Sequence, residues 1–166
     1  MSFELSYGTY DSTIDEKGRV IIPAPLRERY KGELVVTQGS PKCVWVMQPD
    51  VWKKFQNDLK QKQKKISPEQ YRLLHYLHVF AARVTEIDRN TGRIPVAPAV
   101  RTYAGLVNKK CLVMSAEEHL EIWDSEYYYN YLNDKGEDIR EASNTIGTWL
   151  FGFDDSNDQS SRDGEE

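Results

Sequence analysis

The sequence predicts an α+β fold, in which two tandem copies of one small β-rich unit share a core and helices lie at the periphery. An aspartate followed by a Gly-Arg pair occurs twice, within residues 15–19 and within residues 88–93. Short runs rich in β-branched and aromatic residues follow each of these motifs, which is typical of strands. Self-similarity of this kind indicates a duplicated structural unit.

The first copy predicts, in order, a strand, a tight loop, a second strand, a short helix, two more strands and a closing helix. The short helix is expected to begin at Pro25, because the first helical position tolerates a residue without an N–H. It is expected to end before Gly32, since glycine commonly follows the last helical turn. The two later strands fall near residues 34–37 and 44–47.

The second copy repeats this order, with its Gly-Arg pair 74 residues after the first and its short helix between Pro98 and Gly105. Its loop has one more residue between Asp88 and Gly92, which leaves the role of Asp88 open. Pro95 lacks a backbone donor and therefore indicates a strand edge or a bulge. One copy offers too few strands for a stable core, so we expect the two to interleave into one pseudo-symmetric, barrel-like core.

Two helices are expected between the copies, the second with Ser67 as its N-cap and Pro68 at its first position. This region is rich in lysines, which either contact phosphates or form a solvated helix face. These lysines are Lys53, Lys54, Lys60, Lys62, Lys64 and Lys65.

Residues 128–153 are expected to be helical, with apolar side chains that dock on the core or on a neighbouring subunit. Residues 154–166 are acidic and poor in apolar residues, which predicts a disordered tail.

The composition is that of a water-soluble domain, with 39% hydrophobic and 29% charged residues and a net charge of −4. Most of that charge lies in the tail, so the rest of the chain is near neutral and DNA binding is not excluded. No apolar run approaches the roughly 20 residues that span a bilayer, and residues 1–5 do not resemble a signal peptide. We therefore expect a cytoplasmic protein, with Cys43 and Cys111 as buried, reduced thiols.

The doubled motif resembles that of a known family. Asp15-x-Lys17-Gly18-Arg19-x-x-x-Pro23-x-x-Leu26-Arg27 is similar to the first motif of the MraZ transcriptional regulators. Gly92-Arg93, followed by Arg101-x-Tyr103-Ala104-Gly105-Leu106, is similar to the second. Phe80-Ala81-Ala82 and Glu121-Ile122-Trp123 match as well, so that the resemblance covers roughly residues 3–132.

The resemblance implies two SpoVT-AbrB-like domains, at residues 7–52 and 81–127, whose swapped β-hairpins build the common core. Residues 53–80 would then be linking helices. It also implies ring-shaped homo-oligomers that bind G-rich direct repeats in double-stranded DNA, upstream of the family's own cell-division and cell-wall operon. Association with the nucleoid would follow.

The candidate DNA-binding residues lie in and beside the two loops. Gly18 and Gly92 can adopt a positive φ, which allows a tight turn that presents Arg19 and Arg93 at a hairpin tip. The planar guanidinium of arginine fits O6 and N7 of guanine in the major groove. Lys17 is expected to contact phosphate as a point charge.

Three further candidates have roles that the sequence leaves more open. Asp15 is expected either to cap the loop backbone or to hold Arg19 through a salt bridge. Arg27 and Arg101 are included among the DNA-binding candidates, although a structural role on their short helices is favoured for both.

Two other classes of function compete with this interpretation. An enzyme would need a catalytic motif, and none is evident; His75, His78 and His119 are better explained as core or surface residues. The sequence therefore predicts no enzyme, no cofactor, no metal and no small-molecule substrate. The alternative is an antitoxin-like protein of the same superfamily that acts mainly through a protein partner, which the aromatic segment 146–153 and the acidic tail would support.

Overall fold

The structure is a computed structural model, which describes residues 8–80, 82–107 and 110–152. The strands are β1 (Gly8–Thr13), β2 (Arg19–Ile21), β3 (Leu34–Gly39), β4 (Cys43–Met47), β5 (Arg83–Thr85), β6 (Arg93–Pro95), β7 (Lys110–Ser115) and β8 (Leu120–Asp124). The helices are α1 (Ala24–Arg27), α2 (Pro49–Lys62), α3 (Pro68–Leu74), α4 (Pro98–Ala104), α5 (Ser125–Asp134) and α6 (Gly136–Phe151). A 3-10 turn, η1 (Gln63–Lys65), and a π-helical turn, η2 (His75–Phe80), complete the described elements. The acidic segment 154–166, for which disorder is predicted, lies outside the described residues.

The order of elements confirms the duplicated pattern. The first copy contributes β1, β2, α1, β3, β4 and α2, and the second contributes β5, β6, α4, β7, β8 and α5. α4 ends at Ala104 and is followed by Gly105, which is left-handed as a glycine after the last helical turn commonly is, whereas α1 already ends at Arg27. The predicted cap at Ser67 is present, since its hydroxyl accepts from the Gln70 N–H and the Gln70 side chain accepts from the Ser67 N–H.

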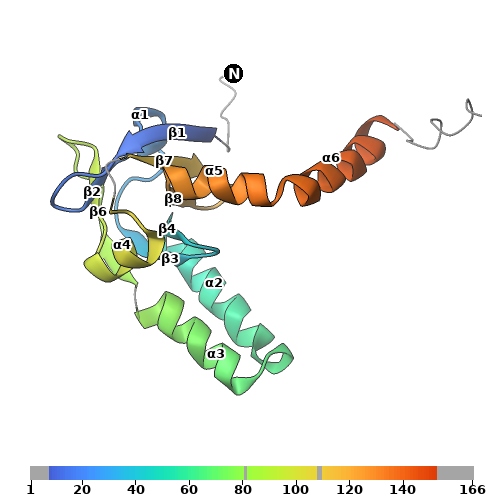
Figure 1. The fold of residues 1–166 in the computed structure, drawn as a ribbon. Coiled ribbons are helices and arrows are strands. Elements are labelled where there is room, and N and C mark those ends of the chain that lie inside the picture. Colours follow the sequence, from blue (N-terminus) through green and yellow to red (C-terminus); the bar gives the residue numbers. More distant parts are fainter. Residues whose placement is uncertain (1–7, 81, 108–109, 153–166) are drawn as a thin grey trace, which may run out of the picture. The chain divides into compact units, whose positions relative to one another are not determined.

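The strands of the two copies are interleaved (Figure 1). One six-stranded sheet has the order β1-β7-β8-β4-β3-β5, and β2 and β6 form a separate two-stranded ribbon. Among the described strands, β3 pairs with β4 and β7 with β8 inside their own copies, whereas β1 pairs with β7, β5 with β3, β4 with β8 and β2 with β6 across the copies. All of these pairs are antiparallel, and strands of both copies contribute to the large sheet and to the ribbon.

The large sheet is not closed in the described part of the chain. Its order begins at β1 and ends at β5, and neither edge strand pairs with the other. The barrel-like closure predicted from the sequence is therefore not confirmed. What is observed is an α+β arrangement of an open antiparallel sheet and a small ribbon, with helices beside them (Figure 1).

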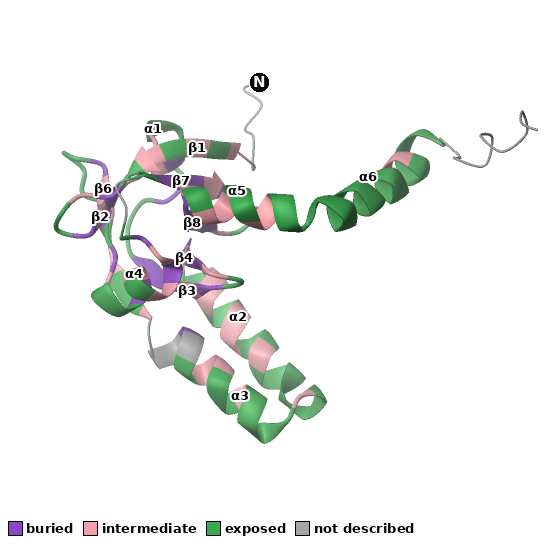
Figure 2. Ribbon diagram, in the orientation of Figure 1, coloured by how far each residue is buried: buried purple, intermediate pink, exposed green. Residues whose placement is uncertain are grey.

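The core lies between the sheet and the ribbon, and buried residues are concentrated in the strands (Figure 2). Its side chains are mainly valine, isoleucine and leucine, drawn from both copies. Fully buried examples are Val20, Ile22, Leu34, Val44, Val46, Ile94, Val113, Leu120 and Ile122. Both cysteines are buried and without a disulfide, as predicted, and burial raises the pKa of the Cys111 thiol to about 12.

The chain divides into two compact units, Met1–Tyr128 and Tyr129–Glu166. In the second unit, the helix α6 is exposed along nearly its whole length (Figure 2). Ile146, Trp149 and Leu150 are among its exposed apolar side chains. Of the helices that the structure describes, none combines the length and the apolar character that a membrane span requires.

Candidate nucleic-acid interface

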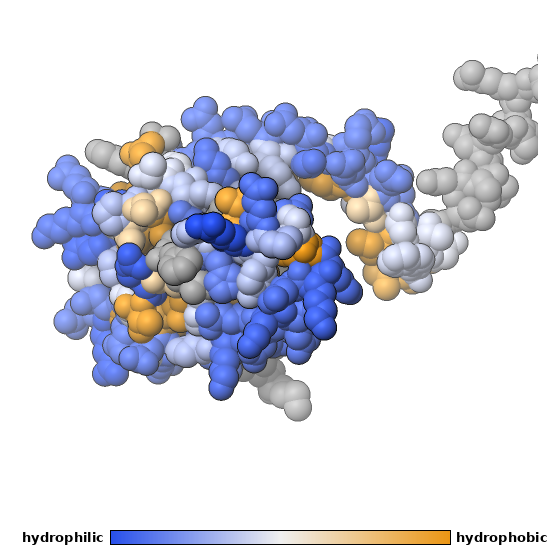
Figure 3. Space-filling view, turned by 90° about the horizontal axis from the view of Figure 1, so that it is seen from below, coloured by the Kyte–Doolittle hydropathy of each residue, from blue (hydrophilic) through white to orange (hydrophobic). Residues whose placement is uncertain are grey.

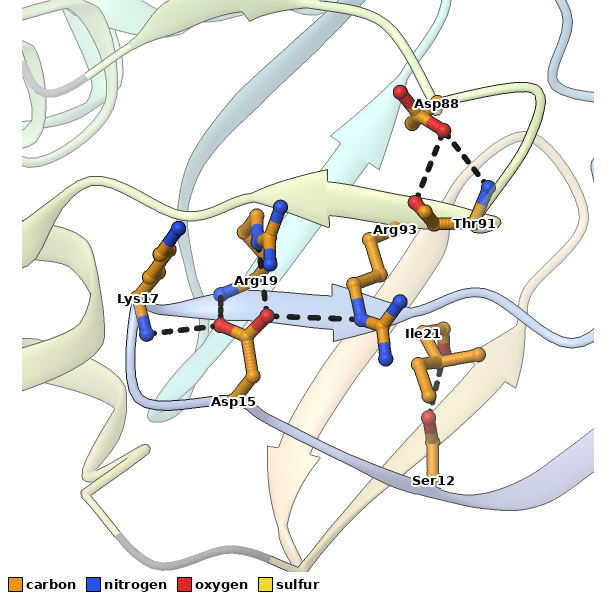
Figure 4. A network of polar contacts seen from close by, with 8 residues as sticks. All are labelled: Ser12, Asp15, Lys17, Arg19, Ile21, Asp88, Thr91 and Arg93. Atoms are coloured by element: carbon orange, nitrogen blue, oxygen red, sulfur yellow. Dashed lines mark hydrogen bonds and ion pairs between the residues drawn. The ribbon is translucent and has the colours of Figure 1, made fainter.

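The β2/β6 ribbon has one buried face and one outer face. Its register places Val20 opposite Ile94, and both of these side chains are fully buried. Because side chains alternate along a strand, the neighbouring Arg19 and Arg93 share the opposite, outer face of the ribbon. The two arginines come from different copies of the repeat, and in Figure 4 they lie side by side over the ribbon.

Asp15 organises the first loop (residues 15–19). Its Oδ1 accepts hydrogen bonds from the N–H groups of Lys17 and Arg19, at 3.0 and 2.9 Å. Its Oδ2 accepts from Nε of Arg19 at 2.8 Å, so Asp15 performs both of the roles that the sequence left open (Figure 4). The Arg19 N–H, more than any other contact, holds the pKa of Asp15 below its usual value.

The same carboxylate also reaches the second copy. Nε of Arg93 lies 3.6 Å from Oδ2 of Asp15, which makes an ion pair but is too long for a hydrogen bond. Asp15 thus lies between the two guanidinium groups and partly balances their charge. These ion pairs hold Arg19 and Arg93 near each other.

The second loop (residues 88–93) is capped in a similar way, despite its extra residue. Oδ1 of Asp88 accepts from the N–H groups of Asn90 and Thr91, at 2.9 and 2.8 Å, and from the Thr91 hydroxyl at 3.0 Å. The Thr91 N–H is the main cause of the lowered pKa of Asp88. Asp88 therefore matches Asp15 as a loop cap, whereas the ion pairs with Arg19 and Arg93 involve Asp15.

In both loops a basic side chain at the tip is exposed, whereas the glycine is buried. Lys17 is exposed in the first loop, and Arg89 is exposed in the second. Gly18 and Gly92 have φ of 76° and 69°, as the sequence predicts for tight turns, but both residues are buried. The turns are therefore accessible through their side chains rather than through the glycine backbone.

Arg27 and Arg101, the last two candidates, lie beside the ribbon rather than on its outer face. Nε of Arg27 donates to the carbonyl of Ile22 at 2.7 Å, and Nη1 of Arg101 donates to the carbonyl of Val96 at 2.8 Å. Both side chains are half-buried. These internal bonds fit the structural role that the sequence favours for them.

Arg89 is a residue that sequence reasoning did not single out. It lines a surface hollow together with Arg19 and Arg93, so three guanidinium groups from two copies border one concavity. The signal that could have found it is the basic residue directly after Asp88, which corresponds to a loop position near Lys17 in the first copy.

The lysine-rich helix region forms a separate, hydrophilic surface. All six lysines between residues 53 and 65 are exposed, and Lys54 pairs with Glu118 at 3.3 Å. The helices α2 and α3 lie at the bottom of Figure 1, and Figure 3, seen from below, shows mostly hydrophilic side chains broken by separate apolar patches. Exposure of these lysines is what both roles left open by the sequence, contact with phosphates and a solvated helix face, require.

His78 and His119 belong to an aromatic cluster around Trp45 of the large sheet, whereas the ring of His75 lies against Tyr71 of α3. His78 is buried, its ring stacks on Trp45 with centroids 5.3 Å apart, and its Nδ1 lies 2.8 Å from the carbonyl of Gln38. Burial lowers the pKa of His78. In the part of the chain that the structure describes, no three His, Cys, Asp or Glu side chains are placed to hold a metal ion.

Glu121 joins this cluster from β8. Its carboxylate accepts hydrogen bonds from the indole N–H groups of Trp45 and Trp123, each at 3.1 Å, and its Oε2 lies 3.1 Å from Nε2 of His119. Burial alone would raise the pKa of Glu121, but these three partners outweigh it and the pKa is lowered. The cluster packs Phe55 of α2 and His78 of η2 against Trp45 of β4.

Comparisons with known proteins identify the family of the chain. A family model described as "MraZ protein, putative antitoxin-like" matches residues 5–74 and 80–147, which is well over half of the chain. The chain is similar to proteins named "Transcriptional regulator MraZ". The one from Treponema denticola is 34% identical over 141 residues, covering 84% of this chain and 96% of the relative.

Two further relatives carry the same name. The protein from Leifsonia xyli subsp. xyli is 37% identical over 126 residues, which covers 75% of this chain and 85% of the relative. The protein from Paenarthrobacter aurescens is 34% identical over 129 residues, which covers 77% and 87% respectively. The chain therefore belongs to the MraZ family.

Proposed function

We propose that this chain is a sequence-specific, DNA-binding transcriptional regulator of the MraZ type, and that the outer face of the β2/β6 ribbon is its reading surface. The observation that carries the proposal is the convergence of Arg19 and Arg93 on that face, between two exposed loops. The names of the relatives support regulation of transcription. Neither an enzymatic activity nor a small-molecule substrate is part of the proposal.

The ribbon suits the major groove of B-DNA, which admits a two-stranded β-ribbon. Arginine is the side chain that most often makes specific contacts there, through paired hydrogen bonds to guanine. Arg19 and Arg93 are the proposed readers, which fits a G-rich target. Lys17 at the loop tip would contact phosphate and so set the position of the protein on the duplex.

The remaining candidates support the readers rather than contact bases. Asp15 restrains Arg19 and Arg93, and the turns at Gly18 and Gly92 bring the loop tips to the surface. We further propose that residues 7–52 and 81–127 are two SpoVT-AbrB-like domains with exchanged hairpins. The pairing of β1 with β7 and of β5 with β3 supports that description.

Oligomerisation would supply the affinity that one ribbon lacks. A single ribbon offers few base contacts, whereas several linked ribbons gain avidity on the order of 10²–10⁴ where the geometry permits simultaneous binding. We propose a ring-shaped homo-oligomer on direct repeats upstream of the chain's own operon, in the cytoplasm and at the nucleoid. Light scattering should then give a mass several times 19.3 kDa, and a monomer would contradict the ring.

The direct test is binding of the purified protein to DNA from upstream of its own gene, measured by fluorescence anisotropy against scrambled DNA. Arg19→Ala should abolish the preference for the upstream DNA, because a bidentate arginine contributes about 1–3 kcal/mol of discrimination. Arg140→Ala is the matched control, since it removes the same charge from the exposed helix α6. Equal affinities of Arg19→Ala and wild type for the upstream DNA would refute the proposed reading role.

A second candidate function is supported by α6. Trp149 and Leu150 are 78% and 69% exposed, and an antitoxin-like protein would use such side chains to bind a protein partner. This alternative predicts a small protein that co-purifies with the wild-type chain and is lost from a Trp149→Ala variant, with DNA binding unaffected by Arg19→Ala.

A further inference from the structure

Each loop glycine is covered by an arginine from the other copy of the repeat. A Cβ placed on Gly92 would collide with the guanidinium of Arg27, and a Cβ placed on Gly18 would collide with that of Arg101. Arg27 belongs to α1 of the first copy and Gly92 to the second, whereas Arg101 belongs to α4 of the second copy and Gly18 to the first. The contacts therefore cross between the copies in both directions.

A hydrogen-bonded circuit closes around each contact. The N–H of Ile22 donates to the carbonyl of Gly92 at 2.8 Å, while the carbonyl of Ile22 accepts from Nε of Arg27 at 2.7 Å. The guanidinium that Ile22 holds in this way is the one that lies against Gly92. Ile22, directly after β2, thus binds Gly92 through its N–H and Arg27 through its carbonyl.

The second circuit repeats the first at the opposite end of the ribbon. The N–H of Val96 donates to the carbonyl of Gly18 at 3.0 Å, and the carbonyl of Val96 accepts from Nη1 of Arg101 at 2.8 Å. Each arginine also borders a hollow formed with the loop that it covers, Arg27 with residues 86–89 and Arg101 with residues 13–16. The recurrence of the whole arrangement in both copies argues against a chance contact.

We propose that Arg27 and Arg101 are positioning residues, each of which locks the loop of the opposite copy and thereby fixes Arg19 and Arg93 on the ribbon. Their effect on DNA binding rests on the proposed function, but the lock itself does not. The flat guanidinium fits against a residue without a side chain while its N–H reaches a carbonyl. A lysine has the charge but neither the plane nor the directed N–H.

Double-mutant cycles test the crossed pairing directly. Gly92→Ala should lower the melting temperature less in an Arg27→Ala background than in the wild type, since only the cost of the positive φ then remains. Gly18→Ala should behave in the same way with Arg101→Ala. The control combinations, Arg27→Ala with Gly18→Ala and Arg101→Ala with Gly92→Ala, use the same four substitutions at positions that do not contact each other, and their effects on the melting temperature should be additive. Additive effects in the contacting pairs, or equal coupling in the control pairs, would overturn the lock.

Amide hydrogen exchange provides a second measurement, which needs no glycine variant. Arg27→Ala should speed the exchange of the Ile22 amide on the order of tenfold and leave that of Val96 unchanged, and Arg101→Ala should do the reverse. Equal changes at both amides, or no change at either, contradict the proposal. Neither this readout nor the cycles involve DNA, so they decide on the lock even if the chain binds none.

DNA binding then separates positioning from contact. At a temperature where the variants are folded, Arg27→Ala and Arg27→Lys should both bind upstream DNA on the order of tenfold more weakly, with the salt dependence of the wild type. Restored binding in Arg27→Lys, wild-type affinity in Arg27→Ala, or a salt slope reduced by about 0.9 would each overturn the positioning role. If Arg19→Ala leaves DNA binding intact, the proposed function fails while the exchange result still stands.

Discussion

The inner face of the ribbon offers a sharp test of the fold, because one valine on it has an exposed counterpart elsewhere. Val20 is fully buried, whereas Val107 is 79% exposed. Val→Ala removes the same atoms at both positions. At Val20 it should lower the free energy of unfolding by about 2–3 kcal/mol, of which about 1.6 kcal/mol is lost burial of two carbons and the rest is the cavity left behind. At Val107 the change should stay within about 0.5 kcal/mol.

Thermal unfolding followed by circular dichroism measures this difference. A loss of about 2–3 kcal/mol corresponds to a fall of about 4–12 °C in melting temperature for a chain of this size. Val20→Ala should also weaken DNA binding, because the ribbon that carries Arg19 and Arg93 loses its anchor in the core. Equal melting temperatures for the Val20→Ala and Val107→Ala variants would refute the assignment of Val20 to the core.

Two further predictions concern titration and salt. Because burial lowers the pKa of His78 in the folded chain, the unfolded chain takes up the proton first, so stability is full above the ordinary histidine pKa of about 6.5 and falls as the pH drops below it. In urea titrations at several pH values, His78→Gln should flatten that dependence, and an unchanged profile would count against a buried, neutral His78. Lys17→Ala should weaken binding to all DNA sequences alike and reduce the slope of log K against log salt by about 0.9, and a wild-type slope would mean that Lys17 makes no phosphate contact.

Local chemistry made much of this molecule predictable from sequence. The order of the elements follows from short-range signals such as Pro98, Gly105 and the N-cap Ser67, each of which acts within one helix turn. Pro95 indicated an edge or a bulge, and the first of these is observed, since among the described strands β6 pairs with β2 in a two-stranded ribbon. Positive φ at Gly18 and Gly92 was likewise a local inference.

What could not be predicted depends on contacts between distant parts of the chain. Strand composition does not say that β1 pairs with β7, nor whether a sheet closes, because partners are chosen by packing across the whole core. The Arg27–Gly92 contact escaped the sequence for the same reason. The role of Asp88 also stayed open at the level of sequence, because the extra residue changes the loop; in the structure the N–H and hydroxyl of Thr91 donate to its carboxylate, so Asp88 caps the loop.

The ion pairs of Asp15 make the two halves of the ribbon different, and this difference affects the orientation in which the protein would bind DNA. A homodimer with an exact twofold axis presents two identical halves, which favours palindromic sites. Here both halves belong to one polypeptide, and a carboxylate from the first half lies between Arg19 and Arg93. The two halves of the ribbon are therefore not equivalent, and a DNA-binding chain of this kind would recognise its site in a single orientation. Copies arranged head to tail along a duplex would all face the same way.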